Sequence, residues 1–123
     1  IRSTMFKDLL REVVENADGA IAGVLMDYEG FAVDSWARDD AAVDIQTVGM
    51  ELSVVLKDVR RASEQLEAGG ANEISIQTDK LVTVVRMLNA EYVVALALTP
   101  EANHGKARFL LRLAVPKLLA ALG

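Results

Sequence analysis

The segment between residues 40 and 67 restricts the fold more than any other part of the sequence. Apolar residues recur there at helical spacing, between a pair of aspartates and Gly69-Gly70. Asp39 or Asp40 can cap the first turn, because a short carboxylate accepts hydrogen bonds from the free amides there. A helix over this range of about 28 residues would extend for roughly 42 Å, more than twice the mean length of a globular helix.

This predicted helix has two apolar faces. A broad arc that should cover a sheet consists of Ala41, Ile45, Val48, Leu52, Val55, Leu56, Val59, Ala62 and Leu66. Val43, Met50 and Val54 lie about 200° away, where a monomer would leave them in water. Single apolar residues are common on protein surfaces, so it is the alignment of these three that indicates an interface.

The other segments predict a layered α/β fold. A helix is expected over residues 5–17, a β-hairpin over 20–36 with Gly30 at positive φ in its turn, and a last helix from about residue 107. Three further strands are predicted over residues 73–78, 81–88 and 92–98. The order α-β-β-α-β-β-β-α predicts a five-stranded, mainly antiparallel sheet between the long helix and the two terminal helices.

Length and composition indicate one domain. Residues 1–4 precede Met5, the more natural initiator, so we expect them to be left over from cloning and residues 5–123 to form the domain. An apolar content of 52% is enough for a single core at this length.

The net charge of −5 disfavours nucleic acid and anionic membranes as partners. The sequence has no cysteine, no membrane-length apolar segment and no secretory signal, so we expect a cytoplasmic protein.

No catalytic, cofactor or metal site is predicted. Glycine-rich phosphate-binding motifs are absent, and His104 is the sole histidine, in a polar loop. Asp39, Asp40 and Asp44 are better explained by helix capping than by a metal. Arg60, Arg61, Arg108 and Arg112 could contact phosphates, although ordinary solvated helix faces explain them as well.

Two sets of residues are predicted to contact other proteins. A free strand edge invites pairing with a second strand, and a two-fold axis allows a patch to meet its own copy. The predicted dimer interface therefore consists of Val43, Met50, Val54, Glu73, Ile74, Ser75, Ile76 and Gln77. The candidates for binding a different partner are Lys57, Arg60, Arg61, Phe109 and Leu113, where the last two could instead pack on the first helix.

Two segments carry a resemblance to a known family. Residues 23–30 read Gly-Val-Leu-Met-Asp-Tyr-Glu-Gly, and residues 99–108 read Thr-Pro-Glu-Ala-Asn-His-Gly-Lys-Ala-Arg. With the order of elements, they resemble the Roadblock family, also named for dynein light chain seven, in its bacterial form that regulates small GTPases. The resemblance covers nearly all of residues 5–122. The positions that match at the last helix are Asn103, Gly105, Arg108, Leu111 and Ala114.

The resemblance implies a homodimer in which the second helices pair and the third strands join two sheets into one. It implies a Ras-like small GTPase as partner, bound by a platform or scaffold that performs no chemistry itself, so Arg61 is not assigned as a catalytic finger. Two alternatives stay open from the sequence. One is a structural subunit of a larger assembly without GTPase contact, and the other is a small-molecule sensor of the PAS or profilin type.

Overall fold

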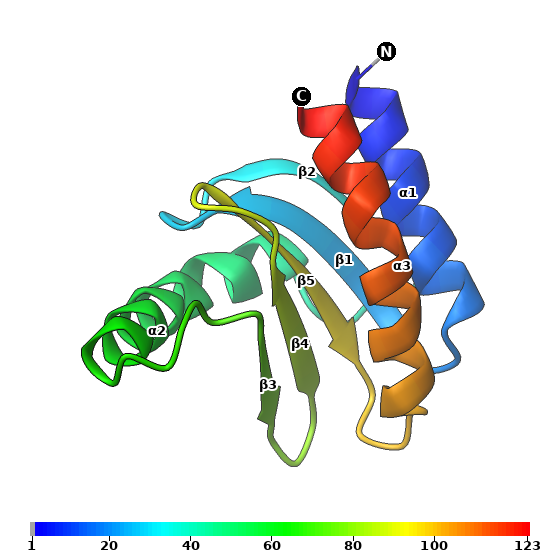
Figure 1. Ribbon diagram of the computed structural model, residues 1–123. Coiled ribbons are helices and arrows are strands. Elements are labelled where there is room, and N and C mark those ends of the chain that lie inside the picture. The colour runs from blue at the N-terminus through cyan, green and yellow to red at the C-terminus, as the bar shows by residue number, and fades with distance from the viewer. Residues whose placement is uncertain (1) are drawn as a thin grey trace.

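The computed structural model describes residues 2–123, with side chains described from Met5 onward, and it has the predicted order of elements (Figure 1). The helices and strands are α1 (Arg2–Asn16), β1 (Ala20–Asp27), β2 (Ala32–Ala37), α2 (Ile45–Gln65), β3 (Glu73–Gln77), β4 (Val82–Met87), β5 (Tyr92–Leu98) and α3 (His104–Leu122). Ile1 lies outside the described residues. Residues 2–4, expected to be left over from cloning, form the start of α1.

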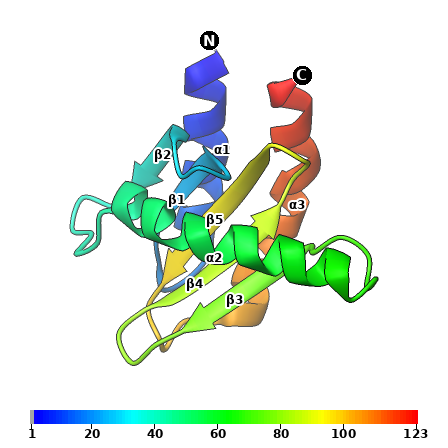
Figure 2. The ribbon, with the colours of Figure 1, turned by 90° about the vertical axis from the view of Figure 1, so that its left-hand side faces the viewer.

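The five strands form one antiparallel sheet in the order β2-β1-β5-β4-β3. In the described part of the chain β3 pairs only with β4, so the prediction that β3 lies at an edge is confirmed. β2 forms the other edge. α2 crosses one face of the sheet, and α1 and α3 cover the other (Figures 1 and 2).

Side chains alternate along the central strand β5 because successive residues of a strand point to opposite faces. Val94, Leu96 and Leu98 join the core beneath α1 and α3. Val93, Ala95 and Ala97 join the core beneath α2. Each fully buried valine or leucine contributes about 1.5–3 kcal/mol, so the two cores hold the helices to both faces.

The long helix is shorter than predicted at both ends. Its N-cap is Asp44, whose carboxylate accepts from the Gln46 amide at 3.1 Å and from the Thr47 hydroxyl at 3.0 Å. Asp39 and Asp40 lie earlier, in a turn that the Ala41 amide closes on the Arg38 carbonyl. α2 therefore has 21 residues and extends for roughly 32 Å.

The C-terminal end of α2 forms before the two glycines. Glu67 takes the left-handed conformation, with φ of 54°, and the Ala68 amide donates to the Ser63 carbonyl across it. This hydrogen bond is typical of a helix that ends at a left-handed residue. Gly69 and Gly70 follow the stop and do not create it.

Candidate protein-interaction surfaces

The face of α2 that packs on the sheet overlaps the predicted arc only in part: Ile45 and Leu56 are buried, and Val48 and Leu52 pack against the same core. Its buried residues are Ile45, Gly49, Ser53 and Leu56. A β-carbon at Gly49 would lie 2.6 Å from Met26 Sδ, so the absence of a side chain there lets the helix approach β1. The buried face is consequently turned by about 80° from the centre of the predicted arc. Of that arc, Ala41 precedes the helix, and Val55 and Leu66 are 40% and 77% exposed.

This rotation leaves one apolar flank of α2 beside the free edge of the sheet. Val48 and Leu52 line a hollow of about 280 Å³ together with Ile76 of β3. Val55 continues the same flank and is exposed, and Val59 is half-buried. We call Val48, Leu52, Val55 and Val59 the β3-side flank. It is contiguous with a strand edge whose amides and carbonyls have no partner strand in the described residues.

A second apolar flank lies on the opposite side of the helix. Met50 is 55% exposed, Val54 is 64% exposed, and Phe31 in the β1–β2 turn is 68% exposed. The turn is tied to the helix by an ion pair of 2.6 Å between Lys57 Nζ and Glu29 Oε2. We call Phe31, Met50 and Val54 the turn-side flank.

The two flanks cannot belong to a single contact made through β3. Val54 lies about 160° around the helix from Leu52, which borders the β3 edge. The prediction that Val43 shares a helical stripe with Met50 and Val54 is wrong. Val43 precedes the N-cap, outside α2, and is half-buried against the core beneath the helix.

Arg60 and Arg61, both predicted to bind a partner, differ in the contacts that they make within the chain. Arg60 lies over the Tyr28 ring, with its guanidinium carbon 4.2 Å from the ring centroid, and it donates to the Ala90 carbonyl. Burial raises the pKa of the Tyr28 hydroxyl, and the charge of Arg60 lowers it in part. Arg61 is exposed and its nearest acid, Asp58, is 3.9 Å away. Arg61 is therefore the more available of the two arginines.

The edge strand carries a half-buried acid, Glu73, whose role the sequence did not reveal. Glu73, with a side chain only 14% exposed, accepts from Arg108 of α3 through both Nε, at 2.9 Å, and Nη2. Arg86 of β4 approaches its other carboxylate oxygen at 3.6 Å. Glu73 thus links the start of β3 to α3. Ile74 and Ile76 are half-buried, and Ser75 and Gln77 are exposed.

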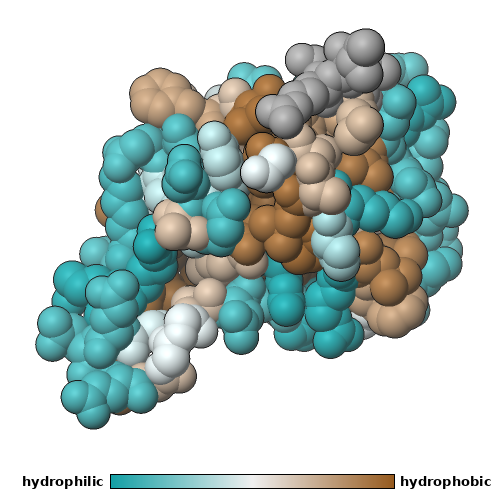
Figure 3. Space-filling model, turned by 45° about the horizontal axis from the view of Figure 1, so that its top comes forward, coloured by the Kyte–Doolittle hydropathy of each residue, from teal (hydrophilic) through white to brown (hydrophobic). Residues whose placement is uncertain are grey.

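The last helix begins at His104, three residues before the predicted start, and leaves apolar residues uncovered. Asn103 caps it by accepting from the Lys106 amide at 3.0 Å, and Leu111 and Ala114 are buried. Phe109 and Leu113 are both more than half exposed, which argues against the alternative that they pack on α1. Figure 3 shows apolar surface along α3 and toward α1, whereas the lobe at the end of α2 is largely hydrophilic.

The described residues were predicted to hold no metal or catalytic site, and two features bear on that prediction. Among the residues that it describes, no group of three or more histidine, cysteine, aspartate or glutamate side chains could hold a metal ion. His104 is the first residue of α3 rather than part of a loop, and its Nε2 is buried without a hydrogen-bond partner. Within residues 2–123 no helix combines the length and apolar character that a bilayer crossing needs.

The fold of the chain is similar to those of several solved structures. The chain is 34% identical to MglC from Myxococcus xanthus, over 94% of this chain and 98% of that one, with a TM-score of 0.69. MglB from Thermus thermophilus is 16% identical, with 98% and 90% of the two chains covered and a TM-score of 0.87. A Roadblock/LC7 domain from Streptomyces avermitilis is 14% identical, with 94% and 96% covered and a TM-score of 0.83. Neither a scan against protein-family models nor a search of curated proteins gives a match.

Proposed function

Because the chain belongs to the Roadblock/LC7 family, we propose that it is a non-enzymatic homodimeric platform that binds a Ras-like small GTPase in the bacterial cytoplasm. The observation that carries this proposal is the pair of apolar flanks on opposite sides of α2. One flank borders a free strand edge and suits a second copy. The other lies away from that edge and suits a different protein.

The second copy pairs through β3 and the β3-side flank. A two-fold axis perpendicular to the sheet makes the two β3 strands antiparallel neighbours and keeps both α2 helices on the same face. The exposed Val55 of one subunit then meets the corresponding flank of the other. Burial of this flank removes apolar surface from water at about 25 cal/mol per Å². The residues proposed for the contact are Val48, Leu52, Val55, Val59, Glu73, Ile74, Ser75, Ile76 and Gln77.

The GTPase binds on the turn-side flank, which such a dimer leaves exposed on both subunits. Phe31, Met50 and Val54 provide an apolar centre, and Arg61 provides a cation on the same side of the helix. Arg61 contributes to binding, and hydrolysis uses the groups of the GTPase itself. Arg60 is held by the Tyr28 ring and by the Ala90 carbonyl in the β4–β5 loop, so it supports the surface without contacting the nucleotide.

Binding is tested with the full chain and a Ras-like GTPase from the same genome, loaded with GDP or with a non-hydrolysable GTP analogue. We expect titration calorimetry to show binding that depends on the nucleotide. Val54→Glu should weaken binding at least tenfold, because a charge at the centre of an apolar contact costs about 1.4 kcal/mol or more. Leu113→Glu is the matched control, since it introduces the same charge at an exposed leucine on the other face of the sheet.

Three results would count against this assignment. Absence of binding in both nucleotide states overturns the GTPase role and favours a structural subunit, which native mass spectrometry of the endogenous complex would identify. Unchanged binding by Val54→Glu moves the contact away from the turn-side flank. Loss of binding in Leu113→Glu alone moves it to α3.

A further inference from the structure

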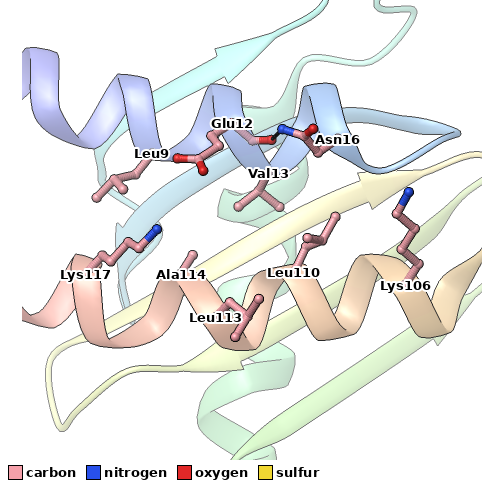
Figure 4. A pocket seen from close by; sticks show the side chains of 9 residues that line it. All are labelled: Leu9, Glu12, Val13, Asn16, Lys106, Leu110, Leu113, Ala114 and Lys117. Carbon is pink, nitrogen blue, oxygen red and sulfur yellow. Dashed lines mark hydrogen bonds between the residues drawn. The ribbon is translucent and has the colours of Figure 1, made fainter.

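The face of the sheet opposite α2 carries an apolar groove between α1 and α3. The two helices run antiparallel along its length, and the groove has a volume of about 340 Å³ (Figure 4). Leu9 and Val13 of α1 and Leu110 and Ala114 of α3 line it. Leu113 lines its outer side and is more than half exposed. A concave apolar channel between two antiparallel helices has the shape that receives a third helix.

The charges around this groove are unequal. α3 carries Lys106, Arg108, Arg112 and Lys117 and no carboxylate, in a chain whose net charge is −5. In the described part of the chain only Arg108 of these four forms a salt bridge. Lys106 and Lys117 lie at the two ends of the groove, roughly 16 Å apart along the helix axis (Figure 4). The groove also contains one acid, Glu12 of α1.

We propose that this groove binds an amphipathic helix of a partner protein, with acidic residues about three turns apart that pair with Lys106 and Lys117. The apolar face of that helix lies against Leu9, Val13 and Leu110, and Leu113 packs along its side. Charge complementarity selects this occupant, because Lys106 and Lys117, which form no salt bridge within the described residues, lie at the two ends of a channel whose other lining is apolar except for Glu12 and Asn16. A second copy would bring another α3 that has only cations, and a flat lipid surface would leave the concave floor unfilled.

The groove and the α2 flanks lie on opposite faces of the sheet, so this interaction and the proposed GTPase contact can fail independently (Figure 2). The probe is a displayed library of helices about 18 residues long, enough for roughly five turns. Their apolar face varies among aliphatic and aromatic residues, and each flanking position is Glu, Gln or Lys. Selection uses the full-length wild-type protein, and the enriched sequences are then made as free peptides.

We expect enriched helices to carry Glu at two positions about eleven residues apart. Leu113→Glu should weaken the binding of the free peptides at least tenfold, since it places a charge in the apolar contact. The double variant Lys106→Glu, Lys117→Glu should no longer bind the peptides with Glu flanks, and it should bind the same peptides when their flanks are Lys. Lys80→Glu, an exposed charge reversal in the β3–β4 turn, should change neither affinity. Unchanged thermal unfolding midpoints confirm that each variant folds.

Four outcomes would overturn the proposal. Enrichment of Gln or Lys flanks, or no enrichment over an unrelated protein, removes the acidic helix as the occupant. Peptide binding that Leu113→Glu leaves intact removes the groove as the site. The third outcome is binding of the wild type, but not of Leu113→Glu, to vesicles of phosphatidylcholine and phosphatidylserine that also displace every peptide. This result would indicate that the groove binds a membrane. The fourth outcome is self-association of the wild type in sedimentation that only the groove variants abolish. This result would indicate that a second copy of the chain occupies the groove.

Discussion

A β-carbon at Gly30 would lie only 2.8 Å from the Cα of Met50. The β1–β2 turn therefore rests directly against the backbone of α2, and it does so with Gly30 at φ of 89°. Both features favour glycine, since other residues rarely adopt this φ and any side chain would force the turn or α2 to shift. This contact positions Phe31, the next residue, relative to Met50 and so holds the turn-side flank together.

Replacing Gly30 with alanine should lower the free energy of unfolding by about 1–3 kcal/mol. The added methyl group must displace the turn from α2, and the positive φ is strained for any side chain. Chemical denaturation of the variant measures this loss. Gly70→Ala is the control, because a β-carbon added there would have no atom within 4 Å beyond its chain neighbours and its φ is not positive. The stability of this variant should change by less than about 1 kcal/mol. Equal losses in the two variants would contradict the close contact.

Gly49→Ala tests how close α2 lies to the sheet. Alanine gains about 1 kcal/mol in helix propensity over glycine, but overpacking a core costs about 1–3 kcal/mol. Because the new methyl group would meet the buried Met26, we expect a net loss of stability. In a Met26→Ala background the space is open, and Gly49→Ala should become stabilising. A double-mutant cycle by denaturation measures this change of sign, and additive effects would argue against the contact.

Glu73→Gln should destabilise the fold by about 1–3 kcal/mol, since it removes the charge that Arg108 and Arg86 contact at a nearly buried site. The loss should disappear in an Arg108→Met, Arg86→Met background, where the two cations are absent. Glu101→Gln, at an exposed position, serves as the control and should change stability little. A Glu73→Gln variant as stable as the wild type would show that this link does not stabilise the fold.

The raised pKa of Tyr28 predicts a specific loss of stability in alkali. In the folded protein the Tyr28 hydroxyl keeps its proton at pH values where an unfolded tyrosine, with a pKa of about 10, has begun to ionise. Its contribution is fully present below that pH and is lost as the pH rises through the folded pKa. Denaturation midpoints measured upward from neutral pH should therefore fall less steeply in Tyr28→Phe than in the wild type. Parallel curves for the two proteins would show that Tyr28 does not cause the loss of stability in alkali.

Much of the fold follows from local pattern, which explains why the order of elements, the edge position of β3 and the positive φ of Gly30 were predictable. The orientation of α2 was not. Helical periodicity reveals that a helix has several apolar positions, but it does not reveal which of them face the sheet. That choice depends on Gly49, whose small size matters only once Met26 of β1 lies opposite.

The candidate surfaces were predictable to a similar degree. Exposed apolar residues at Met50 and Val54 could be found from spacing alone, whereas the flank that borders β3 required coordinates. The interaction of Glu73 with Arg108 joins residues far apart in the sequence, and nothing local marks it. The start of α2 was misplaced because three aspartates in the same short segment are all able to cap a helix.

Sedimentation equilibrium of two neighbouring variants, Val54→Glu and Val55→Glu, tests most directly the claim that the two flanks of α2 have different partners. Both residues are exposed valines on α2 and both receive the same charge, so only their position around the helix differs. We predict a monomer for Val55→Glu and an intact dimer for Val54→Glu. A monomer for Val54→Glu beside a dimer for Val55→Glu would contradict this division, as would a wild type that is monomeric throughout.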